Sequence, residues 1–265
     1  MQTPPVVLTI AGSDSGGGAG IQADLKTIAA LGGFGTCAIT ALTAQNGATV
    51  TGIFPVDPAF VAEQIATNEA GFSIKAAKTG MLFAEPIIKT VAKSLANKTY
   101  PLVVDPVCMS QSGVKLLEDA AISALRTHIL PLADLLTPNL PEAQLLADRE
   151  IKTEEDLVLA GKRLLTMVSG CVLIKGGHNL GEKTVCDTLF LKDTPPISLP
   201  QSRIFTENTH GTGCTLSAAI ATNLAKGHTM LSSIQLAQHY LHQALMTSYT
   251  PGIGAGPVNH LFRLV

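Results

Sequence analysis

Short apolar runs rich in β-branched residues alternate along the chain with longer segments rich in Ala and Leu. This alternation is typical of βαβ units, in which a crossover helix follows each parallel strand. The pattern predicts strands at residues 6–11, 36–42, 50–56, 74–79, 102–105, 135–137 and 171–175. It predicts helices at about residues 20–31, after 57–58, at 85–96, around 119–128, and from residues 141 and 153.

The pattern changes at residues 184–205, where strands joined by turns at 193–196 and 200–202 leave no room for crossover helices. A small antiparallel part is expected there. Two more helices follow, at about 213–226 and 231–248. Because most strands are apolar on both faces, we expect an α/β fold with a mainly parallel central sheet and helices on both sides. No linker or repeat interrupts it, so residues 1–265 are expected to form one domain.

The amino-acid composition and charge exclude several classes of function. The net charge of -2 comes from 18 basic and 20 acidic residues scattered along the chain, so no basic face for nucleic acid or anionic lipid is expected. The five cysteines include no C-x-x-C pair, which favours free thiols in a reducing cytoplasm. No apolar stretch approaches the roughly 18 residues of a membrane span. We therefore expect a soluble, cytoplasmic protein that acts on small molecules.

A glycine-rich turn follows the first predicted strand, and ligands of parallel sheets bind beyond the carboxyl ends of strands. Residues 12–20 read GSDSGGGAG, which lets a ligand approach the backbone closely. Gly18-x-Gly20-x-x-Ala23 formally fits a dinucleotide fingerprint, but no acidic residue lies between Asp24 and Asp57, where that fingerprint needs one. A Walker A Gly-Lys-Ser/Thr is also absent. The turn either meets another ligand or none.

Three later strands also end in polar residues. Asp105, followed by proline, suits Mg²⁺ bound through water, or is ordinary turn chemistry. Asn139 and Glu142 have the spacing of a helix capping box and are equally suited to organising Mg²⁺ and phosphates. Lys175, followed by two glycines, places an ammonium where phosphate oxygens could lie, or is simply solvated.

The sequence His210-Gly211-Thr212-Gly213-Cys214-Thr215 opens one of the last helices. Backbone amides and the positive end of the helix dipole form an anion pocket there, suited to a phosphoryl group in transfer. The same position is expected to lower the pKa of the Cys214 thiol. Cys214 would then take a proton from an attacking hydroxyl. The alternative is a cysteine that only fills space.

In this order the motifs resemble the ribokinase-like family, and in detail the hydroxymethylpyrimidine/phosphomethylpyrimidine kinases of thiamine biosynthesis. The resemblance covers about residues 6–257. It is carried by GSDSGGGAGIQAD at 12–24, TAQN at 43–46, KTGM at 78–81, DPV at 105–107, TPNLPE at 137–142, KGGH at 175–178 and HGTGCT at 210–215.

The resemblance implies transfer of the ATP γ-phosphate to the hydroxymethyl group of 4-amino-5-hydroxymethyl-2-methylpyrimidine, and then a second transfer onto the monophosphate. It implies Mg²⁺ and a homodimer. Cys214 would be the base of the first step. The other implied roles are an anion hole at Gly211, Thr212 and Gly213; phosphate and nucleotide contacts at Lys175, Asn139 and Thr212; metal binding at Asp105 and Glu142; pairing of Gln45 with the pyrimidine; and a pocket completed by Gly12, Asp24, Met81 and Val107.

Other interpretations stay open. The chain departs from the family at Gln111, where a Lys or Thr is usual, so that segment receives no role. A pyridoxal or pyridoxine kinase would use a similar ring and the same reactive group. A thiol hydrolase or acyltransferase would pair Cys214 with His210 or His178. A binding protein without ATP turnover is a further alternative.

Overall fold

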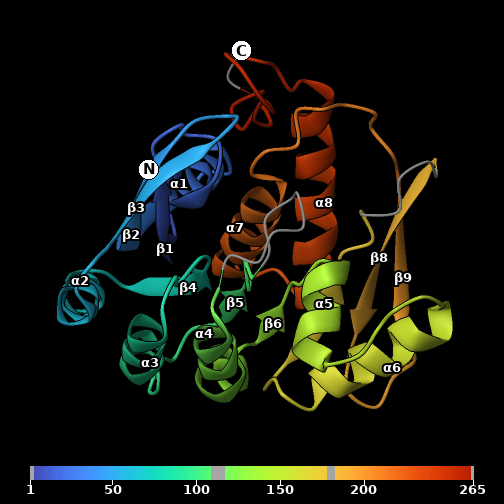
Figure 1. Cartoon of the computed structure of the whole chain (residues 1–265), viewed down its shortest axis with the longest axis horizontal. Helices are drawn as coiled ribbons and strands as arrows, with labels where there is room; N and C mark the ends of the chain where they lie inside the picture. Colours follow the sequence, from blue (N-terminus) through green and yellow to red (C-terminus); the bar gives the residue numbers. More distant parts are fainter. Residues whose placement is uncertain (1–2, 109–116, 178–182, 264–265) are drawn as a thin grey trace.

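A computed structural model describes residues 3–108, 117–177 and 183–263, and these form one nine-stranded sheet in the order β3-β2-β1-β4-β5-β6-β7-β8-β9 (Figure 1). The run from β2 to β7 is parallel, and β3, β8 and β9 are antiparallel to their neighbours. The strands are β1 Val6–Asp14, β2 Phe34–Gln45, β3 Val50–Pro55, β4 Ile74–Thr79, β5 Leu102–Val104, β6 Leu135–Leu136, β7 Cys171–Ile174, β8 Thr184–Phe190 and β9 Ile197–Ser202. The predicted mainly parallel sheet is confirmed.

The helices cover both faces of this sheet (Figure 1). They are α1 Gly20–Ala30, α2 Pro58–Gly71, α3 Glu85–Ser94, α4 Asp119–Ala124, α5 Leu140–Ala147, α6 Glu154–Leu165, α7 Thr212–Ala225 and α8 Met230–Met246. A π-helical turn at Leu125–Ile129 and a 3-10 turn at Leu130–Leu132 continue α4.

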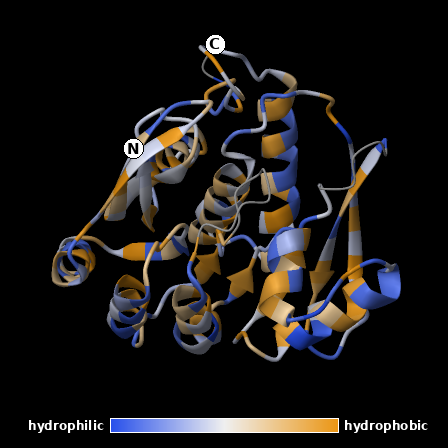
Figure 2. Cartoon of the chain, in the orientation of Figure 1, coloured by the Kyte–Doolittle hydropathy of each residue, from blue (hydrophilic) through white to orange (hydrophobic). Residues whose placement is uncertain are grey.

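Two apolar cores separate the layers, because successive strand residues point to opposite faces. In β1, Leu8 and Ile10 pack against α2 to α6, whereas Val7 faces α1, α7 and α8. Figure 2 shows the apolar strands between the helix layers. In the parts of the chain that are described, no helix combines the length and apolarity needed to cross a bilayer.

Two local predictions were wrong. The first strand does not end at residue 11, because Ser13 and Asp14 resume pairing with β2 after a register shift. Residues 200–202 are not a turn, since Pro200 pairs with Cys186 inside β9. Proline lacks an N–H donor, and an edge strand such as β9 tolerates that loss. The antiparallel part also occurs at both edges of the sheet, rather than only after residue 184.

The buried imidazole of His260 predicts a loss of stability in acid. Burial, assisted by the charges of Lys26 and His210, lowers its pKa from 6.5 to about 4. The unfolded chain therefore binds a proton between pH 6.5 and 4 that the folded chain does not. We expect wild type to lose about 3 kcal/mol of unfolding free energy over this range through His260.

Urea unfolding of wild type and His260→Gln at pH 7 and pH 4.5 measures this difference. The variant should flatten the pH dependence, whereas His239→Gln, a change at an exposed histidine of α8, should leave it unaltered. Parallel curves for wild type and His260→Gln would contradict the assignment.

Candidate active site

The strand order reverses at β1 and β4, because the chain runs from β1 to β2 on one side and later returns to β4 on the other. Ligands of open α/β sheets bind at such a switch point. Gly12 N donates to Met81 O over 3.1 Å, and Gly80 N donates to Ile10 O over 2.9 Å. A Cβ on Gly12 would lie only 2.5 Å from Met81 Cε. The structure thus brings Gly12 and Met81 together, and a side chain at position 12 would require the end of the Met81 side chain to move.

Gln45 ends β2 next to the glycine-rich turn. Its backbone exchanges hydrogen bonds with Ser15, with Gln45 N donating to Ser15 Oγ over 2.8 Å and Ser15 Oγ donating to Gln45 O over 2.9 Å. The half-buried side chain accepts a hydrogen bond from Thr43 Oγ1 through Oε1, over 3.2 Å. Pairing of this amide with a pyrimidine stays a prediction.

Asp24 lies on α1, where it is fully buried and paired with Lys78 of β4. Lys78 Nζ is 3.0 and 2.9 Å from the two carboxylate oxygens, and Thr9 Oγ1 donates to Oδ2 over 2.6 Å. Burial opposes the Lys78 charge, but Asp24, with smaller contributions from Cys214 and Asp105, raises the pKa of Lys78. Asp24 therefore holds a buried cation, and its predicted contact with substrate is untested.

The glycine-rich turn binds an anion of its own, the carboxylate of Asp14. Its Oδ1 accepts from Gly16 N over 2.8 Å, and its Oδ2 accepts from Gly18 N over 3.0 Å and Ala19 N over 2.8 Å. Burial alone would raise the pKa of Asp14, but His210 and these amides lower it below the usual value. Because Asp14 occupies these amides, they are not a vacant phosphate site, which disfavours the dinucleotide interpretation.

Asp105, Lys175 and Gly213 meet at the start of α7. Lys175 Nζ lies 3.2 Å from Asp105 Oδ1, and Ser217 Oγ of α7 donates to Oδ2 over 3.4 Å. A Cβ on Gly213 would lie 3.3 Å from Asp105 Oδ2 and 3.4 Å from Lys175 Nζ. Burial opposes the Lys175 charge, but Asp105 and then Glu142 raise the pKa of Lys175, so its ammonium persists at neutral pH.

The capping box at the start of α5 is present. Asn139 Oδ1 accepts from Glu142 N, and Glu142 Oε2 accepts from Asn139 N, both over 2.9 Å. Glu142 Oε1 also accepts from Cys108 N over 3.1 Å. Burial raises the pKa of Glu142 to about 7, although Lys175 opposes the shift. Val107, half-buried beside Cys108, has φ +40, a strained backbone for a β-branched residue.

Gly211 precedes α7 in a left-handed conformation, with φ +82. A Cβ there would lie 1.9 Å from Gly18 O. Thr212 N reaches Thr209 O over 3.3 Å, a long contact, and the amides that open a helix have no partner within it. Gly213 lies beside Asp105 and Lys175, and an anion hole formed by the amides of Gly211, Thr212 and Gly213 stays a prediction.

Cys214 differs from the expectation of a low pKa. The thiol keeps some exposed surface, but surrounding protein desolvates it and raises its pKa to about 11. Lys78 opposes this shift, whereas Asp24 and Asp105 add to it, and Gly20 N–H bonds the sulfur. Desolvation is the largest influence on this pKa, so the thiol is protonated at neutral pH in this structure.

His210 contacts Asp14, with Nε2 2.8 Å from Oδ2. Its Nε2 is thus engaged elsewhere than at the Cys214 sulfur that a thiol hydrolase would activate. His178 and the segment around Gln111 lie outside the described residues. Sequence reasoning assigned no role to Lys78, although a charged residue within the apolar run Ile74–Thr79 was a usable signal.

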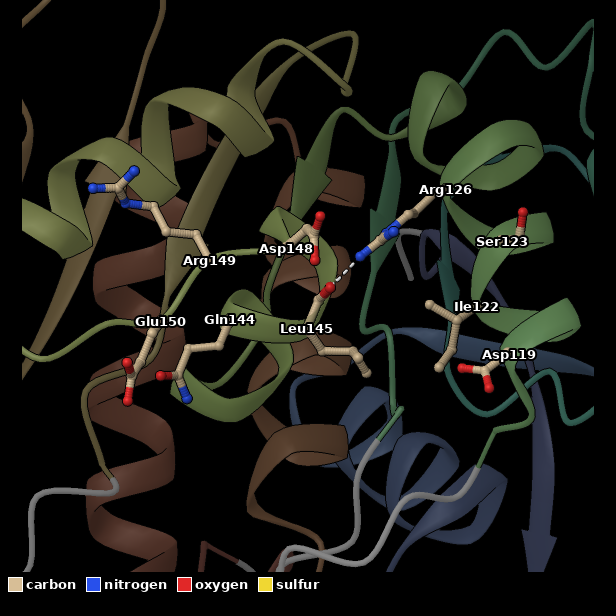
Figure 3. A pocket seen from close by; sticks show the side chains of 9 residues that line it. All are labelled: Asp119, Ile122, Ser123, Arg126, Gln144, Leu145, Asp148, Arg149 and Glu150. Atoms are coloured by element: carbon tan, nitrogen blue, oxygen red, sulfur yellow. Dashed lines mark hydrogen bonds between the residues drawn. The ribbon is translucent and has the colours of Figure 1, made fainter.

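A cavity of about 630 Å³ lies away from these residues, between α4 and the carboxyl end of α5 (Figure 3). Charged side chains line much of it, and Arg126 donates to Leu145 O at its wall. Arg149 at its rim already pairs with Asp156. None of the predicted site residues lines this cavity, so the candidate site is defined by the strand ends instead.

Known proteins resemble this chain over most of its length. The family model described as phosphomethylpyrimidine kinase matches residues 14–259. The hydroxymethylpyrimidine/phosphomethylpyrimidine kinase of Synechococcus elongatus is 46% identical, over 98% of each chain. The thiamine biosynthesis bifunctional protein ThiED of Geobacter sulfurreducens is 46% identical over 96% of this chain, which spans 52% of that relative's length.

Among solved structures, an ADP complex of Bacillus subtilis pyridoxal kinase superposes with a TM-score of 0.90 at 36% identity. It covers 99% of this chain and 100% of its own. The predicted ribokinase-like fold and the predicted kinase class are confirmed. Asp105 and Lys175 follow strand ends and lie together at the start of α7. The chain belongs to the phosphomethylpyrimidine kinase family.

Proposed function

We propose that the chain transfers the γ-phosphate of ATP to 4-amino-5-hydroxymethyl-2-methylpyrimidine, and then transfers a second phosphate onto the monophosphate. The observation that carries this is the meeting of Asp105, Lys175 and Gly213 next to the switch point between β1 and β4. A cation and helix amides neutralise a phosphoryl group, and the acceptor ring would lie at the adjacent strand ends. Family membership supports this substrate class.

In this proposal Lys175 and the amides of Gly211, Thr212 and Gly213 hold the transferred phosphate. Asn139, at the start of α5, supports the nucleotide. Lys175 is suited to its role because it remains charged although it is largely buried. Because both transfers move the same kind of group, both would use this anion site.

Asp105 and Glu142 fit the binding of Mg²⁺ through water. Both carboxylates are buried, and both interact with the charge of Lys175. Burial raises the pKa of Glu142, so a nearby dication would favour the ionised form of the Glu142 carboxyl group. In the described residues no three His, Cys, Asp or Glu side chains gather as a metal cage. Mg²⁺ usually needs only one or two carboxylates besides phosphates and water. When bound, it would neutralise phosphate charge.

The acceptor pyrimidine would lie at the switch point, between Gln45 and the contact of Gly12 with Met81. Gln45 offers one donor and one acceptor to a ring nitrogen and its amino group. Val107 and Asp24 would complete this pocket. The thiolate form of Cys214, which the raised pKa makes the minor form at neutral pH, would accept the alcohol proton in the first transfer only, since a phosphate acceptor is already anionic.

A homodimer belongs to the same proposal. The edge strand β3 is exposed over its whole length, and it shows Val50, Ile53 and Phe54 to solvent next to Leu42 of β2. Exposed apolar groups of this kind mark association surfaces.

The free cysteines agree with a reducing cytoplasm as the location.

A substrate panel tests the proposed function. With ATP and Mg²⁺, we expect ADP release with the aminopyrimidine alcohol and with its monophosphate at comparable rates. Pyridoxal is the control, because the superposed pyridoxal kinase makes it the second candidate. We expect at least tenfold lower kcat/KM with pyridoxal, since Gln45 is matched to an aminopyrimidine edge. A preference for pyridoxal would replace the proposed substrate, and no ADP release with any alcohol would refute the kinase.

A further inference from the structure

The glycine-rich turn and the segment before α7 are 196 residues apart in sequence and are joined by the side chains of Asp14 and His210. His210 Nε2 lies 2.8 Å from Asp14 Oδ2. The two segments are also in close contact. A Cβ on Gly18 would lie 2.4 Å from His210 Cδ2, and one on Gly211 would lie 1.9 Å from Gly18 O.

Asp14 is a rigid anchor for this imidazole. The side chain is 3% exposed and is fixed by the amides of Gly16, Gly18 and Ala19. A carboxylate accepts hydrogen bonds and donates none, so the proton between the two groups belongs to His210 Nε2. The imidazole therefore donates to a carboxylate that the turn itself holds in place.

His210 is held by its backbone as well. Its N donates to Gly256 O over 3.1 Å, and its O accepts from Val258 N over 3.4 Å. These two hydrogen bonds fix the position of the His210 main chain, and the contact of the ring with Asp14 fixes the orientation of the side chain. Gly211 follows directly, so the orientation of the anion-hole amides depends on how His210 is held.

We propose that Asp14 and His210 are a positioning pair, which aims the amides of Gly211, Thr212 and Gly213 at the phosphate in both transfers. The inference rests on the proposed function. Neither residue touches the acceptor in this assignment. An oriented donor lost from an anion hole is costly, and a partial misalignment costs less than its removal. Because both transfers use the same amides, loss of the pair must slow both by a similar factor.

The test compares His210→Gln with His210→Leu. A glutamine amide reaches about as far as Nε2 and still donates to Asp14, whereas leucine fills the space without a donor. We expect His210→Leu to lower kcat about tenfold for the alcohol and for the monophosphate alike, with KM for both pyrimidines within about twofold of wild type. His210→Gln should regain most of the lost kcat.

His210→Asn gives the same comparison if the leucine variant does not fold, because its shorter amide stops about where Nδ1 lies and does not reach Asp14. Equal kcat losses in the glutamine variant and in the leucine or asparagine variant would overturn the inference, as would a loss confined to one transfer or one seen only in KM. If His210→Leu turned over as fast as wild type, the positioning role of Asp14 and His210 would be refuted, and the proposed function would stand. Absence of turnover in wild type would instead refute the proposed function.

Discussion

Cys214→Ala slows phosphorylation of the aminopyrimidine alcohol by about 10²–10⁴-fold and changes phosphorylation of the monophosphate less than about tenfold, if the thiol acts as base. An alcohol must lose a proton as it attacks, whereas a phosphate acceptor is already ionised. Single-turnover rates of the two transfers, measured separately with ATP and Mg²⁺, give the two losses directly. Equal losses in both transfers would refute the base assignment.

The raised pKa of Cys214 adds a second signature to this prediction. Because burial raises it to about 11, the thiolate fraction grows about tenfold for each pH unit between 7 and 9. The first transfer should accelerate with pH over this range in wild type, and the acceleration should disappear in Cys214→Ala. Cys37→Ala is the matched control, since Cys37 is a half-buried free thiol of β2. A flat wild-type profile would contradict a thiolate base.

Lys78→Met is expected to destabilise the protein by about 3–5 kcal/mol, because it leaves the fully buried Asp24 without its cation. Urea unfolding at neutral pH measures the loss. Adding Asp24→Asn in the same chain should restore part of it, since the amide carries no charge and still accepts from Thr9.

The surface pair Lys89 and Glu85 provides the control. Its Nζ–Oε1 distance is 2.7 Å, but the side chains are 54% and 40% exposed, so Lys89→Met should cost less than about 1 kcal/mol. If the double variant were no more stable than Lys78→Met alone, the loss would not come from an unpaired Asp24 charge.

Local patterns predicted most of the fold. The apolar runs located each parallel strand, and Asn139 with Glu142 predicted the capping box that starts α5. These features depend on neighbours within a few residues. The true end of β1 depends instead on β2, which pairs with Ser13 and Asp14 beyond the register shift. Pro200 was misplaced for the same reason, because the partner that accommodates it lies in another strand.

The candidate site was predictable as a set of strand ends, but its electrostatics were not. A helix terminus suggested a low pKa for Cys214, whereas the packing of distant segments decides how much water reaches the thiol. Likewise, Lys78 and Asp24 are 54 residues apart, and only the tertiary structure shows that they neutralise each other. Asp14 as the internal ligand of the glycine-rich turn could be seen only with side chains in place.

The separation of Asp14 from His210 along the chain has a consequence for biosynthesis. The amino-terminal part of a chain is synthesised first, and contacts distant in sequence form more slowly than local ones. The bonds from Asp14 to Gly16, Gly18 and Ala19 span at most five residues, so this turn can order while most of the chain is still to be translated. The nascent chain would then contain the ordered turn that binds His210. It would have no phosphate site until α7 emerges from the ribosome.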